Sequence, residues 1–329
     1  MPLPRSLLSA ACASACTALV TLGPATAGAQ VPGRSPVTTP GVVEATSLTG
    51  QPLLRPEPQG ATRERMEAQL AVARRAYDHT PADADSIIWL GRRTAYLGRF
   101  NEAIDIYTRG LTSHPADARL YRHRGHRYLT TRQLPRAIAD FERAYALTKG
   151  RPDEVEPDGQ PNARNIPTST LQGNIRYHLG LAYYLSGQFD KALPLYREDV
   201  AASRGNNDML VATSHWLYMA LRRLHRDDEA AAVLQPITAS MDVIENGAYH
   251  RLLLLYKGEL TEADLLKNFG PEGNLEDVTT AYGVANWHLY NGRRPQAEAL
   301  LSRITAVRSQ WPSFGYLTAE SELARMVRQ

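Results

Sequence analysis

The sequence predicts an all-α solenoid, and three observations carry this prediction. Apolar and small residues recur at offsets of three and four along many segments, which is the spacing of one face of an α-helix. These segments come in pairs joined by short turns, and the pairs recur about every 34 residues. No alternating apolar pattern of useful length and no Val/Ile-rich run bounded by turns indicates a β-sheet.

The clearest helix pair lies within residues 87–115. Each of its two helices has one narrow face that contains small residues, so the pair packs closely but cannot enclose a core alone. These faces consist of Ile87, Leu90, Gly91 and Thr94 in the first helix and of Ala103, Ile106, Tyr107 and Gly110 in the second. We therefore expect each pair to bury its face only against the next pair, as in a solenoid.

Three segments of the chain share one pattern, which opens at Gly91, Gly125 and Gly180. The pattern resembles the tetratricopeptide repeat, a 34-residue helix-turn-helix unit with Leu-Gly early, Ala followed four residues later by an aromatic residue, and Pro near the end. The matching residues are Leu90-Gly91, Gly98, Ala103, Tyr107 and Pro115 in unit 84–117; Gly125, Tyr128, Ala137 and Phe141 in unit 118–151; and Leu179-Gly180, Tyr183, Gly187, Ala192 and Tyr196 in unit 173–206. Arg132 replaces the turn glycine of the second unit.

Weaker copies at 211–244, 244–277 and 278–311 align on Ala230, Ala263 and Ala297. A lone helix before the first unit and a capping helix within 314–326 complete an array over residues 61–329. The resemblance implies a right-handed superhelix of antiparallel helix pairs. It also implies a non-enzymatic module or scaffold that binds a segment of a partner protein in its concave groove.

The N-terminal segment has the features of a secretory signal peptide. Residues 1–29 contain one Arg, a mostly apolar run and the small-residue site Ala27-Gly28-Ala29, so we expect cleavage after Ala29 and a periplasmic or secreted protein with no stable membrane span. A membrane anchor and a lipid anchor at Cys16 are the alternatives. Both cysteines lie in this segment, so the mature chain would form no disulfide. Residues 30–60 are rich in Pro, Gly and Thr, and we expect a disordered linker there.

A loop insertion at residues 152–172 separates the second and third units, because Gly125 and Gly180 are 55 residues apart. Loops of this length within a repeat array are often functional. Glu154, Glu156 and Asp158 precede Gly159 as in a calcium loop, but the twelfth position has Asn165 where a bidentate Glu is needed. A solvated loop is one alternative. An acidic loop that folds over the basic unit before it is another.

The second unit carries the strongest charge signal, with nine Arg or Lys against two acids, a local charge of +7 in a chain of net charge +3. Carried over to this sequence, the family's groove positions are Arg92, Arg119, Arg122 and His126, followed by Tyr177, Tyr184, His215, Trp216, Tyr256, Tyr282, Asn286 and Tyr290. Guanidinium groups bind carboxylates bidentately, so we expect a partner that is acidic or presents a C-terminal carboxylate. Alternatively, the arginines are solvated and the aromatic residues pack between repeats.

Enzymatic function has little support in the sequence. No H-E-x-x-H, G-x-S-x-G or P-loop spacing occurs, and we expect no catalytic residue, no metal and no cofactor. The alternative is an enzyme or a metal-dependent accessory factor that uses the recurring histidines of the groove, and convergence of several histidine rings would favour it. We expect no nucleic-acid partner, because export separates the chain from nucleic acid and the near-neutral chain offers no long phosphate track.

Overall fold

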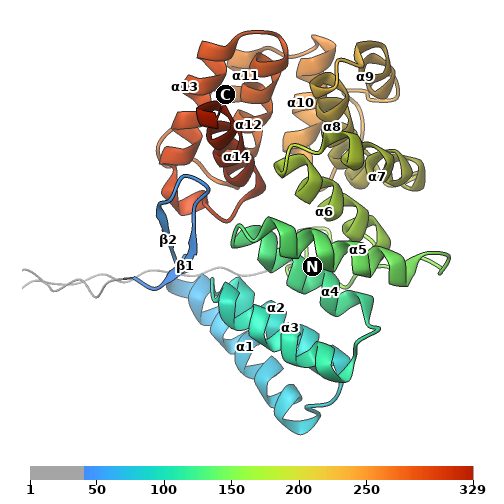
Figure 1. Cartoon of the computed structure of the whole chain (residues 1–329), viewed down its shortest axis with the longest axis vertical. Coiled ribbons are helices and arrows are strands. Elements are labelled where there is room, and N and C mark those ends of the chain that lie inside the picture. Colours follow the sequence, from blue (N-terminus) through green and yellow to red (C-terminus); the bar gives the residue numbers. More distant parts are fainter. Residues whose placement is uncertain (1–40, 329) are drawn as a thin grey trace, which may run out of the picture. The chain divides into compact units, whose positions relative to one another are not determined.

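The computed structural model describes residues 41–328, so the predicted signal peptide, both cysteines and residues 30–40 of the predicted linker lie outside the described part. The described residues form fourteen α-helices and one small hairpin, which confirms the prediction of an all-α solenoid (Figure 1). The helices are α1 (Gly60–His79), α2 (Ala84–Tyr96), α3 (Phe100–Ser113), α4 (Ala118–Thr130), α5 (Leu134–Thr148), α6 (Leu171–Leu185), α7 (Phe189–Ala202), α8 (Asn207–Arg223), α9 (Asp227–Leu234), α10 (Gly247–Lys257), α11 (Glu262–Leu266), α12 (Leu275–Tyr290), α13 (Arg294–Ala306) and α14 (Phe314–Arg328).

Side-chain caps and turn conformations set the ends of the helices. Asp83 accepts a hydrogen bond from Ser86 N at the start of α2, and Asn274 forms a capping box with Asp277 at the start of α12. Glycines with positive φ make most of the turns within pairs, such as Gly98 at φ 74° and Gly187 at φ 73°. In the second pair Arg132 adopts φ 64° instead.

Glycines in the first helix of a pair allow an aromatic ring of the second helix to approach closely. A Cβ atom on Gly91 would lie 2.3 Å from the Tyr107 ring, and one on Gly180 would lie 2.5 Å from the Tyr196 ring. Because real Cβ atoms do not come so close, only glycine permits this packing. The positions that carried the repeat pattern in the sequence are therefore the positions at which the paired helices touch.

Part of the predicted linker is folded. Strands β1 (Val43–Thr46) and β2 (Pro52–Leu54) form an antiparallel hairpin in the register Val43↔Leu54, Ala45↔Leu53 and Thr46↔Pro52, with an irregularity between 43 and 45. Trp311 Nε1 donates to Leu54 O (2.7 Å), and Arg308 Nη2 donates to Pro52 O (2.7 Å). A Pro- and Gly-rich segment shows no periodicity in its sequence, and here it obtains its structure from contacts with distant residues.

The last helix contacts pairs that are far from it in sequence. Ser321 Oγ and Arg325 Nη1 donate to Leu185 O at the end of α6, at 2.7 and 2.8 Å. Arg223 of α8 forms an ion pair with Glu322 of α14 at 2.7 Å. The expectation that each pair packs only against the next is therefore incomplete, because α14 also packs against α6 and α8. Across residues 41–328, no helix has both the length and the hydropathy that a membrane span needs.

Candidate ligand site

Helices α2 and α4 place three guanidinium groups around one small cavity. The cavity has a volume of about 140 Å³, and Arg92 of α2 lines it together with Arg122 and Arg127 of α4. On α4, Arg122 and His126 are one turn apart, as are His123 and Arg127, so all four side chains can reach the same region. Ala95, Tyr96, Tyr107 and Glu156 complete the lining.

One carboxylate of the chain itself, Glu156 of the insertion 152–172, lies in this basic site. Its Oε2 atom lies 3.0 Å from Arg122 Nε and accepts a hydrogen bond from Asn174 Nδ2 at 2.9 Å. His123 Nε2 lies 3.8 Å from Glu156 Oε1. The acidic loop therefore folds over the basic unit, which is one of the alternatives that the sequence left open.

Main-chain atoms of the same loop contact α2. Arg92 Nη1 donates to Pro157 O at 2.8 Å, and Arg93 Nη1 donates to Gly159 O at 2.7 Å. Because the Glu156 side chain pairs with Arg122, it is not part of a calcium-binding loop in this structure. Among the described residues, no group of three or more His, Cys, Asp or Glu side chains is arranged to hold a metal ion.

The cavity has an excess of positive charge. Desolvation lowers the pKa of Arg127 to about 10, and the neighbouring Arg122 and Arg92 act in the same direction. Burial, and then the nearby arginines, also hold the pKa of His123 well below its usual value, so this imidazole is neutral near pH 7. Three guanidinium groups thus face a single carboxylate, an arrangement that favours a further anion.

Arg127 has no carboxylate partner among residues 41–328, and its guanidinium lies 5.4 Å from the centre of the Phe100 ring. The prediction from the sequence missed Arg127, because the groove positions taken from the family do not include it. The sequence could have indicated Arg127, because it is four residues after His123 and so shares a face with it on a helix that has many arginines.

The four basic residues predicted for the groove have different surroundings. Arg92, Arg122 and His126 line the cavity, whereas Arg119 does not and instead forms ion pairs with two aspartates. Its Nη2 lies 2.6 Å from Asp117 Oδ2, and its Nη1 lies 2.6 Å from Asp85 Oδ1. Arg119 therefore already has two carboxylate partners.

Two histidines meet at the edge of the basic cavity. The rings of His126 and His178 lie 4.6 Å apart, and the Phe314 ring lies 5.4 Å from His126. Burial lowers the pKa of His178 to about 3, and its Nδ1 lies 2.6 Å from Asn174 O. No third metal-binding side chain joins these two histidines within the described chain.

Most of the aromatic groove residues predicted from the sequence are inside the protein. The six buried members of this set are Tyr177, Tyr184, His215, Trp216, Tyr282 and Asn286, while Tyr256 and Tyr290 are partly buried. Their polar atoms bond to one another: Trp216 Nε1 donates to Tyr177 OH at 2.7 Å, and Asn286 Nδ2 donates to Tyr184 OH at 3.0 Å. These residues therefore pack between repeats, which is the second alternative given by the sequence: Tyr282 and Asn286 of α12 contact Trp216 and Tyr184 of the earlier helices.

A larger pocket of about 750 Å³ adjoins the basic cavity and shares His126 with it. Its walls come from the starts of α10, α12 and α14, and include Tyr249, Leu275 and Phe314. Nothing in the sequence indicated this pocket, because its walls come from segments that are distant along the chain.

Comparison with known proteins adds a likeness of fold. No model of a known protein family matches the chain, and no curated protein does. The chain is similar to YrrB, described as a TPR protein with an unusual peptide-binding site, at 17% identity and a TM-score of 0.41 over 71% of this chain and 91% of that chain. It is also similar to a putative kinesin light chain of Podosopora anserina with nearly identical TPR-like repeats. One structure of that protein has 16% identity, a TM-score of 0.41 and coverage of 70% and 96%. A second structure has 17% identity, a TM-score of 0.40 and coverage of 70% and 97%.

Proposed function

We propose that this protein is a non-enzymatic interaction scaffold that binds an acidic segment of a partner protein, or its C-terminal carboxylate, at the basic cavity of α2 and α4. The observation that carries the proposal is the convergence of Arg92, Arg122 and Arg127 on a cavity that contains one carboxylate of the chain itself. Guanidinium groups remain charged when desolvated and match carboxylate geometry. The proposed module needs no metal and no cofactor.

The proposed ligand site differs in extent from the groove that the sequence suggested. The aromatic residues are packed inside, so the contacts to a partner are assigned to the basic cavity and its rim. His126 belongs to this site because it lines both the basic cavity and the adjoining pocket.

A library of synthetic ten-residue peptides tests the proposal. The peptides are attached to beads. Half of the peptides have Glu or Asp at fixed positions, and the matched half have Gln or Asn at the same positions. We expect the protein to retain the acidic peptides, less so at higher salt because the attraction is screened. The Arg122→Glu variant should lose most of this retention, and the exposed Arg136→Glu should keep it. The proposal would be refuted if a folded wild-type protein retained both halves equally and also retained peptides with free and with amidated C-termini equally.

We also propose that the protein acts in the periplasm or outside the cell, which rests on the pattern of residues 1–29. N-terminal sequencing of the protein recovered from its native compartment should begin at Gln30. An intact Met1 on the mature protein would contradict this proposal, and a fatty-acylated Cys16 would identify a lipoprotein.

A further inference from the structure

We propose that the insertion 152–172 is an internal competitor for the partner site, with Glu156 in the position that a partner's carboxylate takes. This inference rests on the proposed function. It also specifies the chemistry of the partner segment. The segment is extended, presents a carboxylate to Arg122, and offers main-chain carbonyls to Arg92 and Arg93 one and three residues later, as Pro157 and Gly159 do.

The basic site holds the loop largely through main-chain atoms of the loop. Two of the contacts, to Pro157 O and Gly159 O, use carbonyl groups that every peptide has. The carboxylate of Glu156 is the side-chain group that the basic site recognises, and it is only 9% exposed. A second peptide with an acid at the same place could therefore form the same contacts.

Close packing at Gly159 adds a sequence preference. A Cβ atom on Gly159 would lie 2.0 Å from Tyr96 OH and 2.8 Å from Arg92 Nη2. A side chain at this point of the bound segment would therefore have to displace the ends of the Tyr96 and Arg92 side chains. We expect the partner segment to favour glycine three residues after its acid.

The rest of the loop is held by contacts that can be released. The loop is closed by two main-chain hydrogen bonds, Glu156 N to Ser169 O and Leu171 N to Glu154 O, at 3.2 and 2.8 Å. Further along, Arg164 pairs with Asp242, and both side chains are exposed. Exposed ion pairs contribute about 0–1 kcal/mol, so this pair adds little to the attachment of the loop. Asn162 and Thr168 also bond to Glu245 in exposed positions.

A partner segment can form a carboxylate contact with Arg127 that the loop does not form. Glu156 pairs with Arg122, whereas Arg127 faces the same cavity and has no carboxylate partner in the described chain. When the loop is released, a partner segment that contacts both guanidinium groups gains a contact that Glu156 does not make. This difference in affinity is what shifts the equilibrium toward the released loop.

Two variants of the full chain test the competition. Glu156→Gln removes the competing charge and preserves shape, and Glu154→Gln removes an exposed carboxylate two residues away as the matched control. The probe is a fluorescent, end-blocked peptide with the sequence of residues 152–160, PDEVEPDGQ. We expect the Glu156→Gln protein to bind it roughly tenfold more tightly than wild type, because the internal charge-assisted contact is lost. The Glu154→Gln protein should bind it as wild type does.

The outcomes separate the two proposals. Equal binding by all three proteins overturns the competition but leaves the proposed function intact. If neither this peptide nor the acidic half of the library binds any of the proteins, both proposals fail. A version of the peptide with Gln in place of Glu156 should bind none of them, and equal binding of this version overturns the assignment of Glu156.

Hydrogen exchange on the wild-type protein gives a second readout that needs no variant. With saturating peptide, the amides of Glu156 and Leu171 should exchange faster, because displacement of the loop breaks their hydrogen bonds to Ser169 O and Glu154 O. The amide of Asn101, which donates to Glu44 at 3.0 Å outside the loop, should stay unchanged. Bound peptide with unchanged protection at Glu156 and Leu171 overturns the inference.

Discussion

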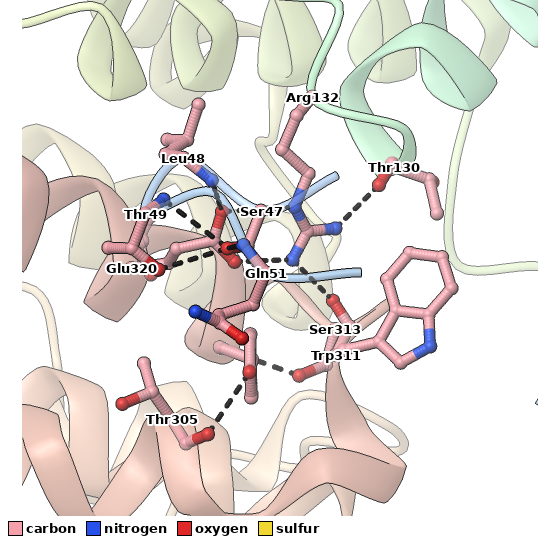
Figure 2. A network of polar contacts seen from close by, with 12 residues as sticks. Ser47, Leu48, Thr49, Gln51, Thr130, Arg132, Thr305, Trp311, Ser313 and Glu320 are labelled. Atoms are coloured by element: carbon pink, nitrogen blue, oxygen red, sulfur yellow. Dashed lines mark hydrogen bonds and ion pairs between the residues drawn. The ribbon is translucent and has the colours of Figure 1, made fainter. Parts of the chain in front are cut away.

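Arg132 and Glu320 form a buried ion pair although 188 residues separate them in the sequence. The distance from Arg132 Nη2 to Glu320 Oε2 is 2.9 Å, and each side chain is only 2% exposed. Figure 2 shows that Arg132 also donates to the main-chain oxygens of Thr130 and Trp311, and that Glu320 accepts from Leu48 N. The pair therefore joins the turn after α4, the C-terminal helix and the loop of the hairpin.

Replacement of Arg132 by Met should lower the free energy of unfolding by about 3–5 kcal/mol, because it leaves the carboxylate of Glu320 buried without its partner. The double variant Arg132→Met/Glu320→Met should recover part of this loss, since no unpaired charge remains. Urea denaturation measures both. Arg136→Met, an exposed change on the same repeat, is the control. A single variant as stable as this control would show that the pair contributes nothing.

The hairpin provides a matched pair of leucines for a second prediction. Leu53 is fully buried, whereas Leu54 is 47% exposed. Leu53→Ala should reduce stability by about 2–5 kcal/mol through lost burial and a cavity, and Leu54→Ala should have a much smaller effect. Thermal or chemical denaturation of the full chain compares them. Equal, small effects would mean that residues 43–54 behave as the flexible linker that the composition suggested.

The helix pairs could be predicted because their signal is local. Gly91 and Tyr107 lie in one unit, and the chemistry that lets them touch is visible within 34 residues of sequence. The hairpin and the pair Arg132–Glu320 could not be predicted, since both depend on contacts between residues far apart in the chain. The sequence shows Arg132 at a turn position where the repeat normally has glycine, but no neighbouring residue indicates that Glu320 is its partner.

Only part of the candidate site could be predicted from the sequence. Charge patterning indicated the basic unit and an acidic loop able to cover it, and Glu156 does lie beside Arg122. The aromatic positions were taken from the geometry of an open groove. In this chain Tyr282 and Asn286 of α12 pack against Trp216 and Tyr184, so these two residues are interior.

A third prediction concerns the contact between the helices of a pair. Ala192 of α7 is fully buried, and Ala139 of α5 is exposed. Ala192→Leu should destabilise the protein by roughly 1–3 kcal/mol through overpacking, and the same should hold for the buried Ala103. Ala139→Leu should change stability little. An unchanged melting midpoint for Ala192→Leu and Ala103→Leu would contradict the assigned register of the repeats.

The last prediction concerns a buried histidine and pH. His215 of α8 is 1% exposed, and its ring lies 4.9 Å from Tyr249 and 5.9 Å from Tyr256. Burial lowers its pKa to about 3, because the charged imidazolium is disfavoured away from water. The unfolded chain takes up this proton near pH 6.5, so between about pH 6.5 and pH 3 it binds one proton more than the native state does. The stabilisation is complete above pH 6.5 and is lost as the pH falls.

The variant His215→Gln removes this titration and should flatten the pH dependence of stability. Each extra proton bound by the unfolded chain lowers the free energy of unfolding by about 1.4 kcal/mol per pH unit. Between pH 7 and pH 5 the wild type should therefore lose about 2 kcal/mol more than the variant. Other groups titrate in the same range, among them Asp199, whose pKa is raised to about 6 chiefly by burial and which acts in the opposite direction. They are common to both proteins, so the difference between the two urea-denaturation series isolates His215. Parallel pH profiles for wild type and variant would show that His215 is protonated equally in the folded and unfolded chains.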